Sequence, residues 1–540
     1  MLLAVAALGV PPAELAAQVA GVIVPTGRQE YFVLGHDQHV WNMMQRVNVG
    51  VGGFFVLQNG MNSVVSAVAS ADGQVVVYDH WEDGFEADAW APVQAQTLVL
   101  GDGNAANGRA CDYTNDPRIV CGAASEDALF RGSPITFNSD QGLGGCAAGI
   151  RCTVPVNPRG TSTRFDGGDR IVTSGGPLAL IHNQFPVPWP QIGGATEVLP
   201  RQAFAGATSY YVPAGENLYS AGGPYLMFRY TALNIVAFDD GTQVFINSPG
   251  AGGGNVSLTL DRGQHYTNCL TWAGTPPICT GGAIDGTSAP GLTINASTKI
   301  SSSGPIAILL FAGGQTTPWA TDFMPILPDL LHGNDYILPS PGDDPAVQGS
   351  RPFNVYAYNP DPLNASTVTA TDSVGTSTIG LAAGATVDYE GAVGRYVPSN
   401  STVRLTSSRS FWGIALHDHL TPANDWGYSW LATDFLTRNY TVSYAPGVEN
   451  PAANSTAAQR TALPPDAECT IPPPGPGVCD SINRSPVFVA AALDNTLVKI
   501  DFDNDGLFDY VDTNGDDYPA TAPPTTAPAR LPLRRGTSPG

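Results

Sequence analysis

The chain has 540 residues, which is enough for more than one domain, and its formal net charge at pH 7 is −23. A surface this acidic repels phosphate backbones and anionic lipids, so nucleic acid and membrane surfaces are unfavourable partners, whereas cations are natural ones. The chain contains no apolar run long enough for a transmembrane helix, and we expect no membrane insertion.

Short runs of Val, Ile, Thr and Tyr, bounded by Gly, Asn, Asp and Pro, recur along the whole chain. Such runs are typical of strands joined by turns. Long helical patterns are not evident, so the sequence predicts an all-β protein. Residues 1–30 are set apart as a possible signal or N-terminal segment, because residues 1–10 are apolar and small residues follow at Ala16 and Ala17.

Two sequence markers repeat together and indicate an internal repeat. Strand-like runs are interrupted by a kink at Pro177, Pro305 and Ser410, which are 128 and 105 residues apart. A Tyr/Pro segment ends at Pro213, Pro339 and Pro446, which are 126 and 107 residues apart. Because both spacings change together, we infer true repeats. The predicted units are 31–185, 210–314, 336–420 and a partial fourth at 440–517, followed by a Pro/Thr-rich tail at 518–540.

Each unit has room for seven or eight strands. Asp72-Gly73, Asp240-Gly241 and Asp494-Asn495 stand between apolar runs, which predicts a β-hairpin at the start of each unit. Two architectures fit this count. Each unit is either a pair of four-stranded blades in a β-propeller-like fold, which we favour, or one of several tandem β-sandwiches.

Carboxylates cluster in the first unit around residues 78–88, where Asp79 and Glu86 flank Trp81. Paired carboxylates beside an aromatic residue suit a glycoside hydrolase, which needs an acid and a base or nucleophile. A structural turn is the favoured interpretation. Two histidine pairs, His36/His39 and His417/His419, have a metal-like spacing, but we favour ordinary core or surface histidines.

Eight cysteines form four local pairs, which we expect to be disulfides in an oxidising compartment. The predicted bonds join Cys111 to Cys121, Cys146 to Cys152, Cys269 to Cys279 and Cys469 to Cys479. Seven Asn-x-Ser/Thr motifs fit a secreted glycoprotein or are chance matches, at Asn255, Asn295, Asn364, Asn400, Asn439, Asn454 and Asn483.

The clearest metal motif lies in the partial fourth unit, after a strand-like run at 498–500. Its carboxylates have the spacing of a loop that wraps Ca²⁺, with a glycine at the sharp turn. The predicted ligands are Asp501, Asp503, Asp505, the carbonyl of Leu507, Asp509 and Asp512. A solvated acidic turn is the alternative, and no other cofactor is expected.

Three segments, at 75–84, 424–427 and 498–506, resemble landmarks of large secreted surface proteins of bacteria and some eukaryotes. The first contains the sequence Tyr-Asp-His-Trp-Glu-Asp-Gly. More distantly, the repeated unit is similar to the N-terminal domain of IgG Fc-binding proteins. The resemblance covers about residues 31–517 and implies an extracellular, non-enzymatic role.

We therefore expect a secreted or cell-surface β-repeat protein with an adhesion, matrix or binding role, whose partner is an extracellular protein or glycan. A carbohydrate-active enzyme using Asp79 and Glu86 is one alternative. A glycan-binding module without catalysis is the other.

Overall fold

The computed structural model describes most of the chain between residues 27 and 436. The described residues are 27–50, 52–53, 61–114, 116, 118–138, 163–186, 194–221, 223–314, 321–340, 353–398, 401–417, 426–436 and 490–492. Four short strands are described by their backbone alone, β1 (Gln18–Val19) paired with β2 (Val22–Ile23), and β28 (Val498–Ile500) paired with β29 (Tyr510–Asp512).

The chain builds the same strand order three times, in antiparallel pairs. In the first repeat one sheet has the order β3 (Gln29–Phe32), β8 (Arg170–Ser174), β5 (Val75–Asp79), β6 (Leu98–Leu100). The other has the order β10 (Gly194–Glu197), β9 (Leu178–Pro186), β4 (Met61–Ala69), β7 (Pro134–Asn138).

The second repeat has the same two sheets, one of them extended. The first is β11 (Ser209–Tyr211), β18 (Lys299–Ser302), β13 (Thr242–Ser248), β14 (Gly254–Leu260). The second is β20 (Thr321–Pro325), β19 (Ile306–Gly313), β12 (Tyr230–Ala237), β15 (His265–Ala273), β16 (Ile278–Ile284), β17 (Thr287–Ala289).

In the third repeat a single 17-residue strand, β26 (Ser401–His417), belongs to both halves. Its first part pairs with β21 (Gly333–Ser340) and β23 (Ser366–Thr371), and β23 pairs with β24 (Thr376–Leu381). Its second part pairs with β22 (Phe353–Tyr358) and β27 (Trp426–Ser429), and β22 pairs with β25 (Thr386–Asp388). The resulting seven-stranded sheet is nearly closed, like a barrel.

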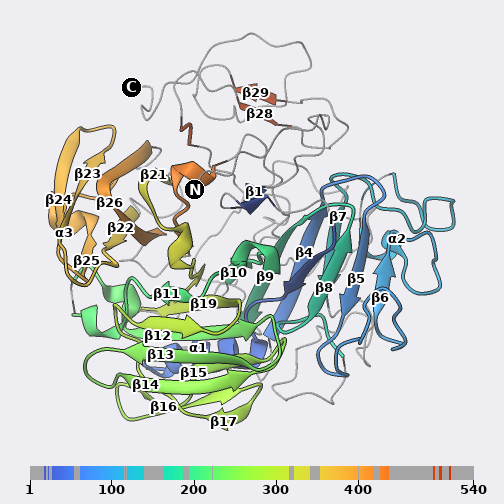
Figure 1. The fold of residues 1–540 in the computed structure, drawn as a ribbon, viewed down its shortest axis with the longest axis horizontal. Helices are drawn as coiled ribbons and strands as arrows, with labels where there is room; N and C mark the ends of the chain where they lie inside the picture. The colour runs from blue at the N-terminus through green and yellow to red at the C-terminus, as the bar shows by residue number, and fades with distance from the viewer. Residues whose placement is uncertain are drawn as a thin grey trace, which may run out of the picture.

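The all-β prediction is confirmed, and the four sheets of the first two repeats are arranged like the blades of a β-propeller (Figure 1). Each of the first two repeats supplies two sheets, as expected, but the chain alternates between them instead of completing one before starting the next. In the first repeat, for example, β4 and β5 follow each other in sequence and belong to different sheets. In Figure 1 the orange third repeat lies on the left, and the blue strands β5 and β6 of the first repeat lie on the right. The green second repeat lies below and between them.

The predicted Asp-Gly hairpins are wrong in the first two repeats. The turn at Asp72-Gly73 connects β4 to β5, and the turn at Asp240-Gly241 connects β12 to β13, and both cross from one sheet to the other. Gly73 and Gly241 each have a φ of 67°, so the positive φ that the sequence demanded is present. A turn of this kind can connect two strands of one sheet, as in a hairpin, or two strands of different sheets, as in a corner. The packing of the strands determines which connection forms. The third such turn, at Asp494-Asn495, lies outside the described residues.

A 14-residue helix, α1 (Asp37–Gly50), is the main element that the sequence prediction missed. Its buried residues Val40, Met43, Met44 and Val47 have the spacing of one helix face. This spacing is present in the sequence and indicates a helix. The helix contacts β12, β15 and β19 of the second repeat and β4 and β9 of the first, so it joins the two repeats. Its buried Arg46 donates from Nη1 to Glu216 Oε1 at 2.8 Å and from Nε to the carbonyl of Pro277 at 3.1 Å.

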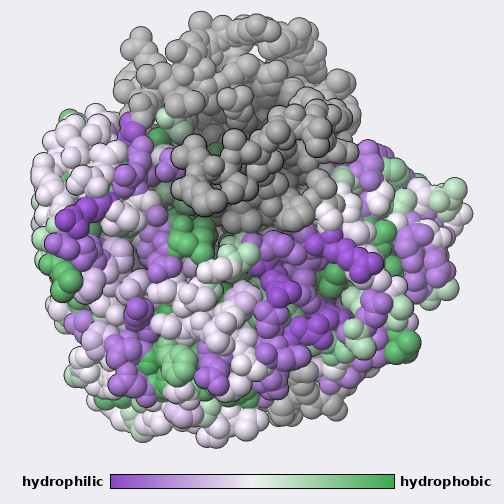
Figure 2. All heavy atoms as spheres, in the orientation of Figure 1, coloured by the Kyte–Doolittle hydropathy of each residue, from purple (hydrophilic) through white to green (hydrophobic). Residues whose placement is uncertain are grey.

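The remaining helices are short. They are α2 (Ala110–Tyr113), α3 (Tyr389–Val393) and the 3₁₀ turns η4 (Arg201–Phe204), η5 (Glu216–Leu218), η6 (Leu226–Phe228), η7 (Asp329–Leu331) and η8 (Thr433–Phe435). Among the described helices, none has the length and apolar character needed to span a membrane. The face drawn in Figure 2 mixes hydrophilic and hydrophobic residues, without one broad apolar patch.

Candidate functional site

The most unusual group of side chains lies where β5 ends and β8 begins. These strands are neighbours, and Asp79 at the end of β5 is opposite Arg170 at the start of β8. The turn after β5 carries His80, Trp81 and Glu82, and the loop before β8 carries Asp166 and Asp169. All of these side chains are buried, at 4% exposure or less. The first repeat therefore encloses many ionisable groups in one place.

Asp79 and Glu86, the carboxylates considered for catalysis, are engaged in the structure of the turn. Asp79 Oδ2 accepts from Arg170 Nη2 at 2.5 Å and from the backbone N–H of Glu86 at 3.1 Å. Burial raises the pKa of Asp79 to about 6, although Arg170 opposes the shift. Glu86 Oε1 accepts from the backbone N–H groups of Val93 at 2.7 Å and Gln94 at 2.6 Å. Both carboxylates therefore hold the turn together through hydrogen bonds.

Asp169 lies at the centre of the buried group. Its Oδ2 accepts from the Tyr78 hydroxyl at 2.6 Å and from the Asp166 N–H at 3.0 Å, and its Oδ1 accepts from the Trp81 N–H at 3.0 Å. The Trp81 indole donates to Asp166 Oδ1 at 2.8 Å. These bonds fix both carboxylates, and burial followed by the nearby charge of Glu82 raises the pKa of Asp166 well above its ordinary value.

His80, Glu82 and Asp169 form a compact trio, with one possible ligand atom from each lying within 4.8 Å of the others. His80 Nδ1 donates to the carbonyl of Arg164 at 2.6 Å and is 3.6 Å from Asp169 Oδ2. Among the described residues, neither His80 Nε2 nor Glu82 Oε2 has a hydrogen-bond partner. His80 and Glu82 therefore each have one buried polar atom without a partner in the described part of the chain.

The charges of the trio depend strongly on one another. Burial alone would lower the pKa of His80, but the adjacent Asp169 outweighs it and raises that pKa to about 9. Burial, and then the charge of Asp169, raises the pKa of Glu82 to about 8. Both shifts favour the protonated forms of His80 and Glu82 at neutral pH.

The second repeat has the same turn without the charges. Arg170 and Lys299 occupy equivalent places in the strand register, because Ile171 pairs with Tyr31 and Ile300 pairs with Tyr210. The N–H of Asp166 donates to Asp169 Oδ2 at 3.0 Å, and the N–H of Asn295 donates to Thr298 Oγ1 at 3.2 Å. Neutral side chains therefore form this turn as well. Of these two repeats, only the first has acids at the two positions.

A second buried array includes serine, histidine and aspartate, but it does not have the geometry of a catalytic triad. Ser63 Oγ donates to His182 Nε2 at 2.6 Å, while His182 Nδ1 donates to the carbonyl of Leu34 at 2.8 Å. Asp37 contacts Ser63 at 3.3 Å instead of orienting the histidine. All three side chains are at most 2% exposed. A substrate has no access to this serine, which argues for a structural role.

Of the two histidine pairs, His36 and His39 are brought together and buried. Their rings stack at 4.3 Å, and His36 also contacts the ring of Trp81 at 5.0 Å. Burial lowers the pKa of His39 well below its ordinary value, so its ring is neutral. The side chain of His417, and all of His419, lie outside the described residues.

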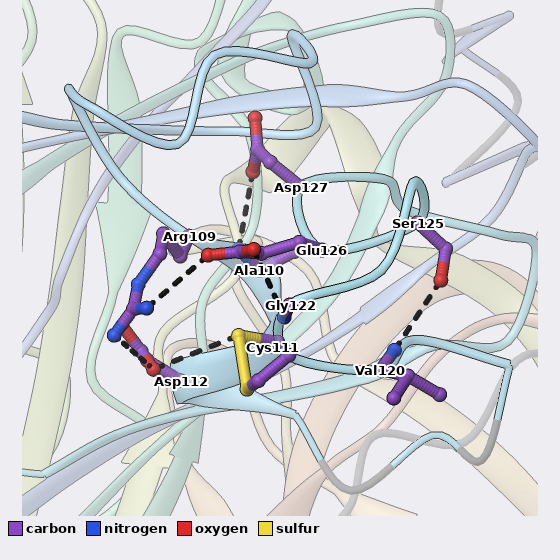
Figure 3. The surroundings of a disulfide bond; sticks show 10 residues. Arg109, Ala110, Cys111, Asp112, Val120, Gly122, Ser125, Glu126 and Asp127 are labelled. Atoms are coloured by element: carbon purple, nitrogen blue, oxygen red, sulfur yellow. Dashed lines mark hydrogen bonds and ion pairs between the residues drawn. A yellow bond between two sulfur atoms is a disulfide. The ribbon is translucent and has the colours of Figure 1, made fainter.

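Two of the predicted disulfides are present, joining Cys111 to Cys121 and Cys269 to Cys279. Figure 3 shows the first, with Arg109 bonded to Asp112 at 2.8 Å and to Glu126 at 3.1 Å on the neighbouring segments. Disulfide-bonded cysteines are typical of an oxidising environment. The other two predicted pairs, Cys146/Cys152 and Cys469/Cys479, lie outside the described residues.

The glycosylation prediction fails at Asn295, which is 1% exposed and donates from Nδ2 to the carbonyl of Ala251 at 3.2 Å. Asn255 and Asn364 are exposed. The other four motifs lie outside the described residues.

The predicted calcium loop is flanked by the paired strands β28 and β29, so the expected strand before the loop is confirmed. Asp512 is the last residue of β29, whereas Asp501, Asp503, Asp505, Leu507 and Asp509 lie outside the described residues. The calcium site stays a prediction. No protein-family model, curated protein or solved structure matches the chain.

Proposed function

We propose that this is a secreted or cell-surface β-repeat protein with a non-enzymatic adhesion, matrix or binding role. The proposal rests on the burial and the hydrogen bonding of Asp79 and Glu86. Both are at most 2% exposed, and their oxygens accept bonds from Arg170 and from backbone N–H groups. A glycoside hydrolase needs two carboxyl groups that reach the substrate, and these two are committed to the fold. The disulfides support an extracellular setting.

The test compares catalysis with folding in one variant. We expect the wild-type protein to turn over no glycoside in a substrate panel, so Asp79→Asn should have no glycosidase activity to lose. The variant should instead melt at a lower temperature, because Arg170 loses its buried counter-charge. Turnover by the wild type that disappears in a folded Asp79→Asn protein would establish the enzyme alternative.

A glycan is a second candidate ligand class, supported by a shallow groove of about 250 Å³ in the first repeat. The groove is lined by Trp90 together with Glu30, Asp88, Arg28 and Gln202. An aromatic ring surrounded by polar groups is a suitable platform for a sugar ring, which has apolar faces and polar edges. A glycan array should then give signals that Trp90→Ala removes. Equal signals in Trp90→Ala would exclude this groove.

A further inference from the structure

We propose that His80, Glu82 and Asp169 form a binding site for one divalent transition-metal ion such as Zn²⁺. The three side chains come from two adjacent segments, the turn after β5 and the loop before β8. This site is separate from the calcium loop predicted at residues 501–512, and it does not depend on the proposed function.

The donor set and its spacing fit such an ion. Zn²⁺ binds imidazole nitrogen and carboxylate oxygen at about 2.0–2.2 Å, so any two of its ligand atoms lie within about 4.4 Å of each other. One possible ligand atom from each of the three residues lies within 4.8 Å of the other two, which is close to the spacing that an ion requires. An imidazole among the donors favours a transition metal over Ca²⁺, which prefers oxygen ligands.

The histidine is already held as a metal-binding histidine is held. A ligating imidazole usually donates its other N–H to a carbonyl or carboxylate, which fixes the tautomer. His80 Nδ1 donates to the carbonyl of Arg164 at 2.6 Å, and Nε2 has no partner among the described residues. Binding through Nε2 therefore releases the proton that this nitrogen carries in the protonated ring and keeps the existing hydrogen bond of Nδ1.

The carboxylates are arranged in a corresponding way. Asp169 is positioned by the Tyr78 hydroxyl and the Trp81 N–H, as the outer partners of a metal ligand position it. Glu82 is 4% exposed, and its Oε2 has no partner in the described part of the chain. A buried polar atom without a partner is costly, and a bound cation would satisfy it.

The second repeat provides an internal comparison. Asn295 and Thr298 make the same turn as Asp166 and Asp169, with the matching N–H bond at 3.2 Å against 3.0 Å. The turn itself therefore does not require acids. A bound cation would explain their presence beside His80 and Glu82, because it would offset the repulsion between these carboxylates once all of them are ionised.

The experiment uses the full-length protein, stripped with a chelator and then titrated with ZnCl₂. We expect one equivalent of zinc at this site and a rise in melting temperature, because a ligand that binds only the folded state stabilises it. Glu82→Gln and Asp169→Asn should each weaken zinc binding by about a hundredfold or more, beyond the 10–100-fold typical of outer partners. Asp83→Asn is the matched control, since Asp83 is an exposed acid on the same turn, and it should bind zinc as the parent does.

X-ray absorption at the zinc edge of the wild-type protein supplies a readout that does not need the variants to fold. One nitrogen and two carboxylate oxygens from the protein, without sulfur, is the expected donor set. A sulfur donor would assign the zinc to cysteines and overturn the proposal. A melting temperature that does not respond to Zn²⁺, Mn²⁺ or Co²⁺ would also overturn it, and would leave the trio as an internal ion pair between His80 and Asp169.

Discussion

The hydroxyl of Tyr336 donates to the carbonyl oxygen of Phe411 at 2.6 Å, and so ties β21 to the second half of β26. The same bond recurs in the second repeat, where Tyr210 donates to Ile306 at 2.7 Å. In the first repeat the hydroxyl of Tyr31 accepts from the N–H of Leu178 at 2.8 Å. All three partners directly follow the kink, so in each repeat this bond joins the first strand to the segment that follows the kink.

The contribution of this hydrogen bond to the free energy of unfolding should be measurable. Tyr210→Phe removes the hydroxyl and leaves the buried carbonyl of Ile306 without this donor, so we expect a loss of about 1–2 kcal/mol in the free energy of unfolding. Urea denaturation gives the value. Tyr211→Phe is the control, because Tyr211 is only partly buried, and its midpoint should stay close to that of the parent. Equal losses in the two variants would contradict the assignment.

Arg46 should be more important to stability than any exposed arginine. Arg46→Met removes the partner of Glu216 at a site where the arginine is 1% exposed and the glutamate 14%. Breaking such a pair leaves an uncompensated charge, and we expect a loss of about 3 kcal/mol. Arg109→Met is the control, because Arg109 is 44% exposed in its pair with Asp112, and it should cost less than about 1 kcal/mol. A small effect at Arg46 would mean that α1 does not hold the two repeats together through this pair.

Asp322 predicts a particular dependence of stability on pH. Burial raises its pKa from 3.8 to about 8, and neither carboxylate oxygen has a partner among the described residues. At a pH between these two pKa values, Asp322 is protonated in the folded protein and ionised in the unfolded chain. Stability should therefore fall as the pH rises from about 4 to about 8, by up to about 1.4 kcal/mol per pH unit from this group.

Asp322→Asn removes the ionisation, so it should flatten that fall and raise the unfolding free energy at pH 8 above that of the parent. Chemical denaturation at several pH values measures both effects. Asp329→Asn, an exposed carboxyl on η7, should leave the slope unchanged. The same slope in Asp322→Asn and the parent would assign the pH dependence to other groups.

The two observed disulfides should differ in their sensitivity to reductant. Cys269 is completely buried, whereas Cys121 is exposed, so a thiol reaches the bond between Cys111 and Cys121 first. Timed alkylation and peptide mass spectrometry should detect free Cys111 and Cys121 before free Cys269 and Cys279. Mapping of the unreduced protein should also find the pairs Cys146/Cys152 and Cys469/Cys479. Bonds between different pairs would contradict the local pairing.

The calcium loop should respond to Ca²⁺ independently of the zinc site. Millimolar Ca²⁺ is expected to raise the melting temperature, and Mg²⁺ much less, because Mg²⁺ demands tighter octahedral geometry. Replacing both Asp501 and Asp503 by Ala should abolish the calcium response and leave the zinc response intact. A calcium shift that persists in the double variant would place that site elsewhere.

The sequence predicted the all-β fold well because strands depend on local patterns. The tyrosines, the kinks and the turns at Gly73 and Gly241 can all be recognised from the residue types in the sequence. Which sheet each strand joins was not visible, because a positive φ at Gly73 suits a corner as well as a hairpin. The site was harder to predict. The turn containing His80 was noticed, but Asp166 and Asp169 are more than 80 residues away and are brought to it by the pairing of β5 with β8.

The continuous strand β26 has a mechanical consequence. In the first two repeats a Gly-Pro break separates the strands of the two sheets, at Pro177 and Pro305, so each sheet has its own ends. In the third repeat the same 17 residues bond to β21 and β23 and then to β22 and β27. Tension applied to either half passes straight along one backbone into the other. The third repeat should therefore open as one unit under load, whereas the earlier repeats have a joint at which their halves can part.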